Sequence, residues 1–394
     1  MIFPFQPARI DTRIAAALVL AVIALPMFLS GCDSSSSSSS PRVATLYAGG
    51  NSSQGIDVFD LAANGSLTLR ENFNSDQSLF NPRSMAINAE GERLVAGLSA
   101  STGLQIFPVH ADTGELTDID VYLDIRNIQV AAHPELDVFY ASRSGGLGTL
   151  HAVAVEDIGT MSEALLQIDE YDTTHNIASS VIHPSGGYVF ISHADNAPDP
   201  SEHWVTMLPL DAAGEFNPPA AEEILVQDDV WNPRIKAISP DGDMLIITSS
   251  NSYNRVGFVT INTTTESLTM DTGPLNAHYR GAVFHPDGNW AYAATVSGVV
   301  TAYAIDRTAG EITQIGENLD GPPLDNGVGV LAISPDGTTL FSALEGDDLA
   351  GNPGQIAIID IDQSDGSLSL RTTVDMNIVD PLSLLATVTG PDNQ

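Results

Sequence analysis

The sequence predicts an all-β fold in which repeated four-stranded antiparallel units close into a ring, and three observations support this. A turn signature recurs at intervals of 45 to 56 residues along the chain. Apolar segments of strand length flank each turn, and we find no helical domain after residue 31. The two ends of the chain hold the pieces of one more unit, so the ring can close on itself.

Each unit is organised around a tight turn in which proline, glycine or both set the backbone. Proline fixes the φ of the first turn residue, and glycine supplies the positive φ that the reversal requires. Each turn is therefore expected to join two antiparallel strands. The six turns are Asn88-Ala-Glu-Gly91, His133-Pro-Glu-Leu136, His183-Pro-Ser-Gly186, Ser239-Pro-Asp-Gly242, His285-Pro-Asp-Gly288 and Ser334-Pro-Asp-Gly337.

The segment around the fifth turn illustrates the four strands of a unit. Gly281–Phe284 precedes the turn and Trp290–Ala293 follows it. Val299–Ala304 then alternates as a third strand, and Gly310–Thr313 supplies a glycine turn and a short fourth strand. Four strands in about 45 to 50 residues are typical of a β-propeller blade.

Six turns give six blades, and the chain ends supply a seventh. Thr45–Ala48, Ile56–Phe59 and Ser66–Leu69 are expected to be the second, third and fourth strands of that blade, with Pro381–Thr387 as its first strand. Sharing one blade between the N- and C-terminal strands removes the sheet edges of an open ring. We therefore expect a seven-bladed β-propeller over residues 43–390.

The first 31 residues are expected to be a bacterial lipoprotein signal peptide. Two arginines precede an apolar run at residues 14–29, and Leu29-Ser30-Gly31-Cys32 matches a lipobox in which Cys32 takes the lipid. The alternative is an uncleaved membrane anchor, but a run of about 16 residues is shorter than the ~20 that a bilayer needs. Residues 32–42 hold the acylated cysteine and a serine-rich tether. This predicts attachment to the bacterial cell envelope, at the periplasmic face or the outer surface.

The charge balance excludes some functions. The chain has 50 acidic and 14 basic residues and a formal net charge of −36, and Lys236 is its only lysine. Nucleic acid is not an expected ligand, because phosphate backbones need a basic partner. A single cysteine allows no internal disulfide and no thiolate zinc site. So acidic a surface is typical of a protein that faces a salty exterior, where ions screen its self-repulsion.

Arginines at equivalent positions form the first candidate site. Arg83, Arg234 and Arg280 each lie five residues before their turn, and Arg126 lies near the same rim of another blade. Loops at this end of the blades open around the central channel, where propellers usually bind ligands. Four guanidinium groups could clamp a carboxylate or a phosphate, because each offers a fixed fork of donors. The alternative is that each arginine ties its blade to the backbone or the acidic loops of the next blade.

The histidines divide by position. His133, His183 and His285 stand in the turns at the opposite end, where we expect them to cap the turn. His175 and His278 lie at the rim, just before first strands, where they could face a ligand.

Two long loops and a short rim segment complete the candidates. The loop His193–His203 is either a His/Asp/Glu metal site or a hydrophilic surface loop. Asp325-Asn326 could supply an acid or a hydrogen bond at the rim. The loop at residues 345–354 is either a solvated loop or a calcium site through Asp347, Asp348 and Asn352. We expect no other cofactor.

Two motifs resemble the lactonase-type seven-bladed propellers, the family of the 6-phosphogluconolactonase and carboxymuconate-cyclizing enzymes. They are Tyr47-Ala…Gly-Ile-x-Val-Phe-Asp-Leu…Gly-Ser-Leu67 and Arg280-Gly-Ala-Val-Phe-His-Pro-Asp-Gly-Asn-Trp-Ala-Tyr292. The resemblance covers nearly all of residues 43–390 and implies the fold and a lactonase ancestry. Against the family pattern, Gly281 stands in place of the histidine of an Arg-His pair, and Thr295-Val296 in place of an Asn-Glu pair. A histidine-rich stretch of the family is approximated by His175-Asn176.

Two functions from different classes follow. The first is an envelope hydrolase acting on a lactone that carries a carboxylate or phosphate, with Arg280, His175 and Asp325 as catalytic residues. Its ligand-binding residues would be Arg83, Arg126, Arg234, His278 and Asn326. The second is a non-enzymatic propeller that presents one face to an envelope protein or glycan, and the replaced family histidine and glutamate favour it. In both cases we expect a monomer attached to the membrane through Cys32.

Overall fold

The computed structural model places the propeller between residues 42 and 388. The structure describes residues 42–50, 55–74, 81–98, 103–118, 122–125, 129–143, 148–157, 163–173, 176–193, 204–217, 222–225, 233–249, 256–271, 279–309, 311–346 and 352–388. Within these ranges the one helical element is the single-turn 3-10 helix η2 (Leu324–Asn326). No helix in the described part is long and apolar enough to cross a membrane.

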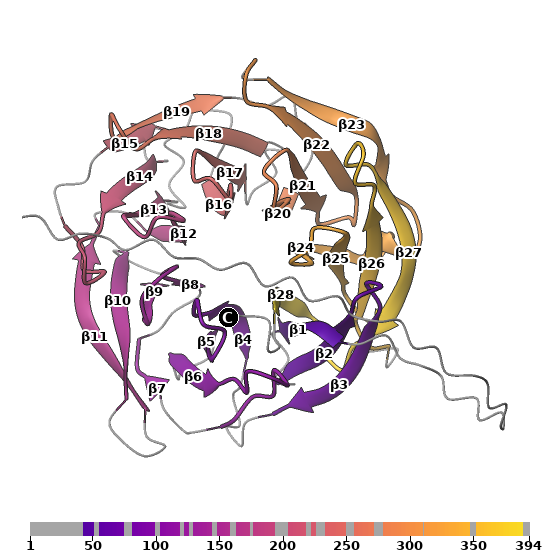
Figure 1. Cartoon of the computed structure of the whole chain (residues 1–394), viewed down its shortest axis with the longest axis horizontal. Helices are drawn as coiled ribbons and strands as arrows, with labels where there is room; N and C mark the ends of the chain where they lie inside the picture. Colours follow the sequence, from indigo (N-terminus) through magenta and orange to yellow (C-terminus); the bar gives the residue numbers. More distant parts are fainter. Residues whose placement is uncertain are drawn as a thin grey trace, which may run out of the picture. The chain divides into compact units, whose positions relative to one another are not determined.

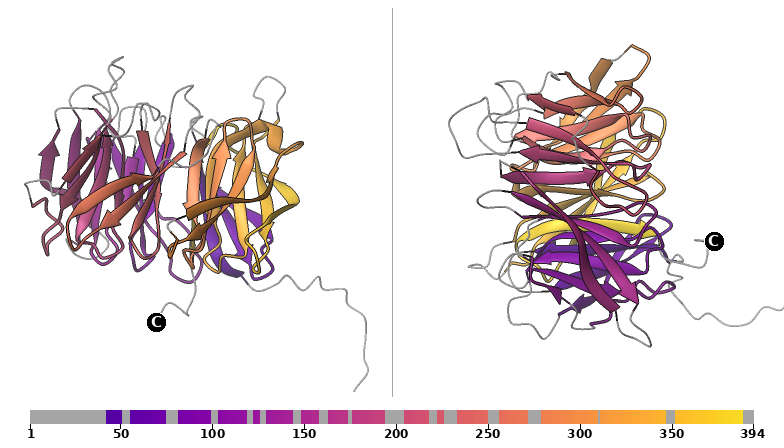
Figure 2. Two further views of the ribbon diagram at one scale, coloured as in Figure 1. Left: turned by 90° about the horizontal axis from the view of Figure 1, so that it is seen from above. Right: turned by 90° about the vertical axis from the view of Figure 1, so that its left-hand side faces the viewer.

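Seven antiparallel sheets of four strands each stand around a central channel, which confirms the predicted fold (Figure 1). Six sheets take their strands from consecutive chain segments. The seventh, in the order β28-β1-β2-β3, joins the C-terminal strand to the three N-terminal strands. The strand pairing from Ala44–Val388 to Gly49–Ser383 therefore closes the ring, as the sequence predicts. Figure 2 shows the same blades from the side.

The strands fall into four concentric sets (Figure 1). The innermost strands are β28 (Pro381–Val388), β4 (Pro82–Ile87), β8 (Gln129–Ala132), β12 (Ile177–Ile182), β16 (Pro233–Ile238), β20 (Tyr279–Phe284) and β24 (Gly327–Ile333). The second strands are β1 (Arg42–Gly50), β5 (Arg93–Leu98), β9 (Val138–Arg143), β13 (Tyr188–His193), β17 (Met244–Ser249), β21 (Trp290–Thr295) and β25 (Thr339–Leu344). The third strands are β2 (Ile56–Ala62), β6 (Leu104–Pro108), β10 (Thr149–Asp157), β14 (Trp204–Pro209), β18 (Val256–Asn262), β22 (Val300–Asp306) and β26 (Gln355–Ile361). The outermost strands are β3 (Leu67–Phe73), β7 (Tyr122–Leu123), β11 (Glu163–Asp172), β15 (Glu222–Leu225), β19 (Ser267–Asp271), β23 (Glu311–Leu319) and β27 (Leu368–Asp375).

The apolar core lies between neighbouring blades. Seven buried clusters each combine side chains from two adjacent blades. At the closing seam, Leu46 and Phe59 of the closing blade pack with Phe341 and Ile358 of the preceding one. Each blade is therefore apolar on both faces, and closing the ring removes the last two of these faces from water.

Turn histidines fasten neighbouring blades at one end of the ring. His133 Nδ1 accepts hydrogen bonds from the backbone N–H groups of Glu135 and Leu136, each at 3.1 Å. Its Nε2 lies 3.1 Å from the carbonyl oxygen of Gly186, in the turn of the next blade. His285 makes the corresponding contacts with its own turn and, at 3.0 Å, with the next blade. The expected turn-capping role is confirmed, and each of these histidines also bridges two blades.

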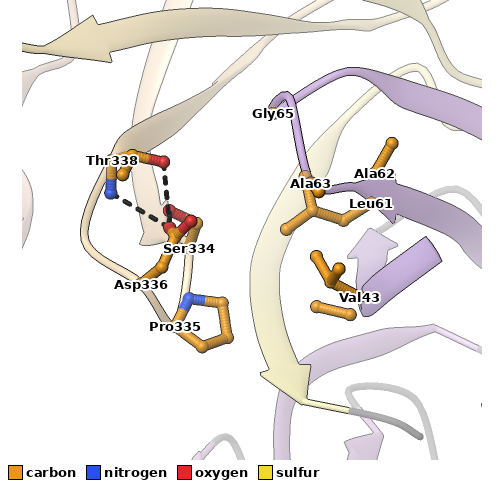
Figure 3. A pocket seen from close by; sticks show the side chains of 10 residues that line it. Val43, Leu61, Ala62, Ala63, Gly65, Ser334, Pro335, Asp336 and Thr338 are labelled. Carbon is orange, nitrogen blue, oxygen red and sulfur yellow. Dashed lines mark hydrogen bonds between the residues drawn. The ribbon is translucent and has the colours of Figure 1, made fainter. Parts of the chain in front are cut away.

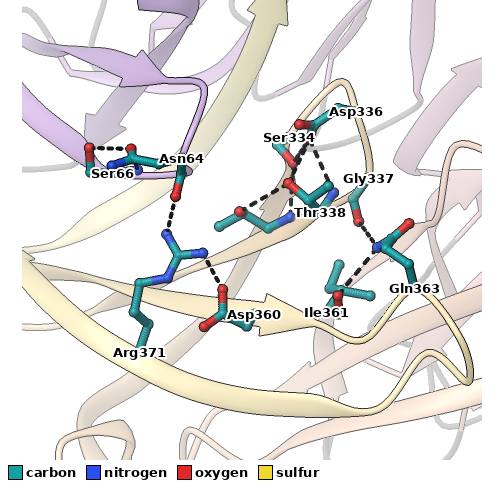
Figure 4. Close-up of polar contacts among 11 residues, drawn as sticks. Asn64, Ser66, Ser334, Asp336, Gly337, Thr338, Asp360, Ile361, Gln363 and Arg371 are labelled. Carbon is teal, nitrogen blue, oxygen red and sulfur yellow. Dashed lines mark hydrogen bonds and ion pairs between the residues drawn. The ribbon is translucent and has the colours of Figure 1, made fainter. Parts of the chain in front are cut away.

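Two arginines bridge blades at the same end: Arg371 on an outermost strand (Figure 4) and Arg307 in the turn after β22. Arg371 of β27 donates to the Asn64 carbonyl oxygen of the closing blade at 2.8 Å and pairs with Asp360 beside it. Arg307 pairs with Asp241 of the preceding blade at 2.8 Å and also with Asp243. For these arginines, which the sequence interpretation did not single out, the role is to tie adjacent blades together.

Candidate functional site

All the side-chain charge on the innermost strands is positive. Arg83 lies on β4, Arg234 and Lys236 lie on β16, and Arg280 lies on β20. The seven innermost strands contain no aspartate, glutamate or histidine. In a chain of net charge −36, this set of cations makes the channel the region that attracts anions.

Three of the four cations occupy β-bulges. On β4 the pairing with the second strand passes from Pro82 to Ser84, which leaves Arg83 without an opposite residue. The same irregularity leaves out Arg280 on β20 and Lys236 on β16. A bulge re-aims the side chain of its extra residue and locally twists the strand. The bulges thus give these side chains directions that a regular ladder would not.

The charges of Arg83 and Arg280 act on Arg234 from other blades of the ring. Burial lowers the pKa of Arg234, and the charges of Arg280 and Arg83 lower this pKa further. The blade of Arg83 is separated from that of Arg234 by two blades in one direction and three in the other, so their strands β4 and β16 lie on opposite sides of the ring (Figure 1). Within the described residues, the Arg234 Nε is buried without a hydrogen-bond partner. The arrangement can therefore offer several donors to one anion.

Lys236 is a channel residue that the sequence interpretation did not propose for the site. Its half-buried side chain lines a cavity of about 510 Å³, whose walls include Val181, Val283 and Phe284. Burial, and next the charges of Arg234 and Arg280, lower the pKa of the Lys236 ammonium to about 7. A sequence signal existed, since the only lysine of the chain lies two residues after a candidate arginine in the same strand.

The predicted acid Asp325 and its neighbour Asn326 lie in a different cavity. Both are exposed residues of η2, and they line a polar space of about 910 Å³ with Glu345 and Asp375. No channel arginine is among the described residues that line this space. The structure thus places Arg83, Arg234 and Arg280 on innermost strands, and it places the pair 325–326 at a rim cavity that none of these arginines lines.

Several predicted residues lie outside the described part of the chain. This set comprises Cys32, Arg126, His175, His278, His203, Asp347 and Asp348. Of the two loop sites, His193 is described: it is buried, and its Nε2 lies 2.7 Å from the Thr206 hydroxyl oxygen. Within the described residues, no group of three or more His, Cys, Asp or Glu side chains could hold a metal ion.

Two of the three positions where the sequence departs from the lactonase pattern have a structural role in this fold. A Cβ at Gly281 would overlap the backbone carbonyl oxygen of Gly329 on β24, so a histidine does not fit there without movement of the backbone. The Thr295 hydroxyl accepts a hydrogen bond from the Val299 N–H at 3.0 Å and so holds its own turn. Val296 is exposed at the rim cavity. These positions offer no acid or base in this chain.

A third cavity, of about 390 Å³, lies at the turn end beside the closing seam (Figure 3). Apolar atoms from Val43 and Leu61 form one side, and the turn Ser334–Thr338 forms the other. The Asp336 carboxylate is engaged within this turn by Ser334 and Thr338. The channel end with the arginines is therefore the candidate site with the most chemistry to offer.

Comparisons with known proteins agree with this fold. The family model described as "Lactonase, 7-bladed beta-propeller" matches residues 38–132. A comparison with curated protein sequences found no significant match. A Lactobacillus plantarum protein superposes with a TM-score of 0.68 at 15% identity, covering 88% of this chain and 100% of its own.

Two candidate 6-phosphogluconolactonases have the same architecture. The protein from Bacteroides fragilis NCTC 9343 has a TM-score of 0.67 at 18% identity and covers 90% of this chain and 100% of its own. That from Bacteroides uniformis ATCC 8492 has a TM-score of 0.64 at 19% identity, covering 88% and 99%. The chain is thus a seven-bladed β-propeller, and the match over residues 38–132 supports its resemblance to the lactonase-type propellers.

Proposed function

We propose that the arginine end of the channel binds a small organic anion, through a carboxylate or a phosphate. One observation carries this proposal: Arg83, Arg234 and Arg280 lie on innermost strands of three different blades, and the seven innermost strands contain no acidic residue. Like charges held together cost free energy in the empty protein. A bound anion would offset that cost, and each guanidinium can donate two parallel hydrogen bonds to a carboxylate or phosphate.

Binding is tested with inorganic phosphate, malonate and gluconate by calorimetry on the purified full chain. The variant Arg234→Gln/Arg280→Gln is expected to weaken the tightest of these interactions by about a hundredfold, near tenfold for each charge-assisted contact removed. Arg307→Gln is the matched control, because this arginine is paired with Asp241 at the other end of the ring. No binding by the wild type, or equal binding by the double variant, would overturn the proposal.

Hydrolysis of a lactone that carries such an anionic group is the second candidate function. The lactonase family match over residues 38–132 supports it. Arg280, exposed at the channel, would polarise the lactone carbonyl and stabilise the oxyanion that water addition creates. The absence of a side chain at Gly281 favours binding without hydrolysis. A panel of aldonolactones and their phosphates decides between the two: turnover that disappears in Arg280→Ala supports hydrolysis, whereas binding without turnover supports a receptor or scaffold.

We further propose that the propeller works at the bacterial envelope, attached by a lipid on Cys32. The lipobox at residues 29–32 and the serine-rich segment that follows support this. Lipid attachment is tested by metabolic labelling with a tagged palmitate, with Cys32→Ser as the control. Equal labelling of the two proteins, or recovery of the wild type free of membranes, would contradict it.

A further inference from the structure

The channel cavity contains an amine that the proposed anion site does not need. Lys236 lines this cavity together with Ser180, which is 7% exposed and whose hydroxyl has no hydrogen-bond partner within the described residues. The bulge at Lys236 shifts the pairing from Ile235 to Ala237, so the lysine does not follow the regular alternation of β16. We propose that Lys236 is a reactive amine that condenses with the carbonyl carbon of a small oxo acid whose carboxylate Arg234 and Arg280 hold.

The surroundings of Lys236 favour a neutral amine. Arg234 shares its strand, and Arg280 lies on the adjacent innermost strand, β20. Among the other elements packed against β16, β12 and β17 carry no titratable side chain, and β13 carries Tyr188 and His193 at its two ends. No innermost strand supplies a carboxylate to pair with the ammonium. The pKa of Lys236 near 7 agrees with this geometry, because burial and neighbouring cations are the two known means of activating a lysine nucleophile.

The chemistry balances without a further reagent. The Lys236 Nζ forms a bond to the carbonyl carbon, and the carbonyl oxygen leaves as water with two protons from the amine. The remaining C=N bond is an imine, whose protonated form is cationic. The carboxylate of the oxo acid then offsets the charge of the neighbouring guanidinium groups. This inference rests on the proposed anion site, and it names the substrate class as oxo acids.

The experiment uses glyoxylate as the anionic aldehyde and glycolaldehyde as a neutral aldehyde of similar size, each with cyanoborohydride. Reduction of the imine fixes a carboxymethyl or hydroxyethyl group on the amine. Because Lys236 is the only lysine, its peptide reports the ε-amine, and the N-terminal peptide serves as the internal reference. We expect preferential labelling of Lys236, rising to half its maximum near pH 7, and a preference for glyoxylate that falls about tenfold in Arg234→Gln/Arg280→Gln.

Lys236→Arg is the charge-matched variant and is expected to take no label in this peptide while still binding phosphate. Wild-type labelling no faster at Lys236 than at the N-terminus, or an equal preference for the two aldehydes, would overturn the inference. If phosphate still binds in those cases, the proposed anion site survives. If phosphate fails to bind while Lys236 is labelled equally by both aldehydes, the anion site itself is wrong.

Discussion

The innermost and outermost strands of the blades carry opposite charge. The seven innermost strands hold three arginines, one lysine and no acidic residue. The seven outermost strands hold eleven acidic residues and two arginines. Both outer arginines are paired, Arg70 with Asp60 and Arg371 with Asp360. An average over the chain conceals this sorting, in which acid faces solvent and base faces the channel.

The molecule contains two kinds of arginine, which differ in the charges that surround them. Arg307 lies between Asp241 and Asp243 of a neighbouring blade, and its charge is neutralised where it stands. Arg234 is surrounded by other cations instead, and burial with the charges of Arg280 and Arg83 lowers its pKa. The first arrangement stabilises a seam. The second holds like charges close to one another, which is an arrangement common at binding sites.

The largest expected effect concerns the close approach of two innermost strands. Gly281→Ala should lower the free energy of unfolding by about 3 kcal/mol, because its Cβ meets the Gly329 backbone, which cannot rotate away. Gly187→Ala is the control, since its Cβ would lie 3.4 Å from the flexible Ser185 hydroxyl. Chemical denaturation measures both. Equal stabilities would mean that β20 and β24 can separate, and that the histidine of the lactonase pattern could be restored.

The next effect should differ in sign between the two kinds of arginine. Arg307→Met should lower the free energy of unfolding by about 1 to 2 kcal/mol, because it leaves two carboxylates without their partner. Arg234→Met should raise it by about 1 kcal/mol in a buffer without phosphate or carboxylates. Its pKa is depressed in the folded state, so the charge opposes folding at neutral pH. Destabilisation by both changes would show that Arg234 stabilises the fold as Arg307 does.

Much of the fold could be predicted from the sequence because its signals are local. Proline and glycine define each turn within four residues, and the offset from the turn to Arg83, Arg234 and Arg280 identifies equivalent places in three blades. The closing blade followed from strand counting alone. These predictions do not depend on the register between strands, that is, on which residues lie opposite one another.

The rest of the site depends on tertiary packing. The bulge falls at Arg83 and Arg280 on their strands but two residues later, at Lys236, on β16. No sequence rule places this shift, so the lysine was overlooked. Asp325 was expected near the arginines because it precedes an innermost strand. The η2 turn instead leaves it exposed in the rim cavity.

The histidines at the turn end should make the stability of the protein depend on pH below about 6.5. Burial lowers the pKa of His133 and of His183, opposed in part by their bonds to the next blade. The unfolded chain therefore binds protons first, and stability should fall as the pH drops below about 6.5. The test variant is His133→Asn/His183→Asn, because asparagine occupies the equivalent turn position, Asn88, in another blade. Near pH 7 the free energy of unfolding of this variant should be lower by about 1 kcal/mol for each interblade hydrogen bond removed. Between pH 7 and pH 5 its free energy of unfolding should fall less steeply than that of the wild type. If the variant and the wild type lose stability equally steeply with falling pH, these histidines are not the source of the acid sensitivity.

The smallest effect for a single residue should come from the outer acids. Glu311 on β23 is exposed, so Glu311→Gln should change the free energy of unfolding by less than about 0.5 kcal/mol. Its sign is informative: removing one of many like charges should stabilise the protein at about 10 mM salt and be neutral near 1 M, where the Debye length is about 3 Å. Melting temperatures across this range measure it, and the wild type itself should melt higher as salt rises. A wild-type melting temperature indifferent to salt would show that the outer carboxylates are too well solvated to repel. The sorting of charge by strand would then matter for the channel alone.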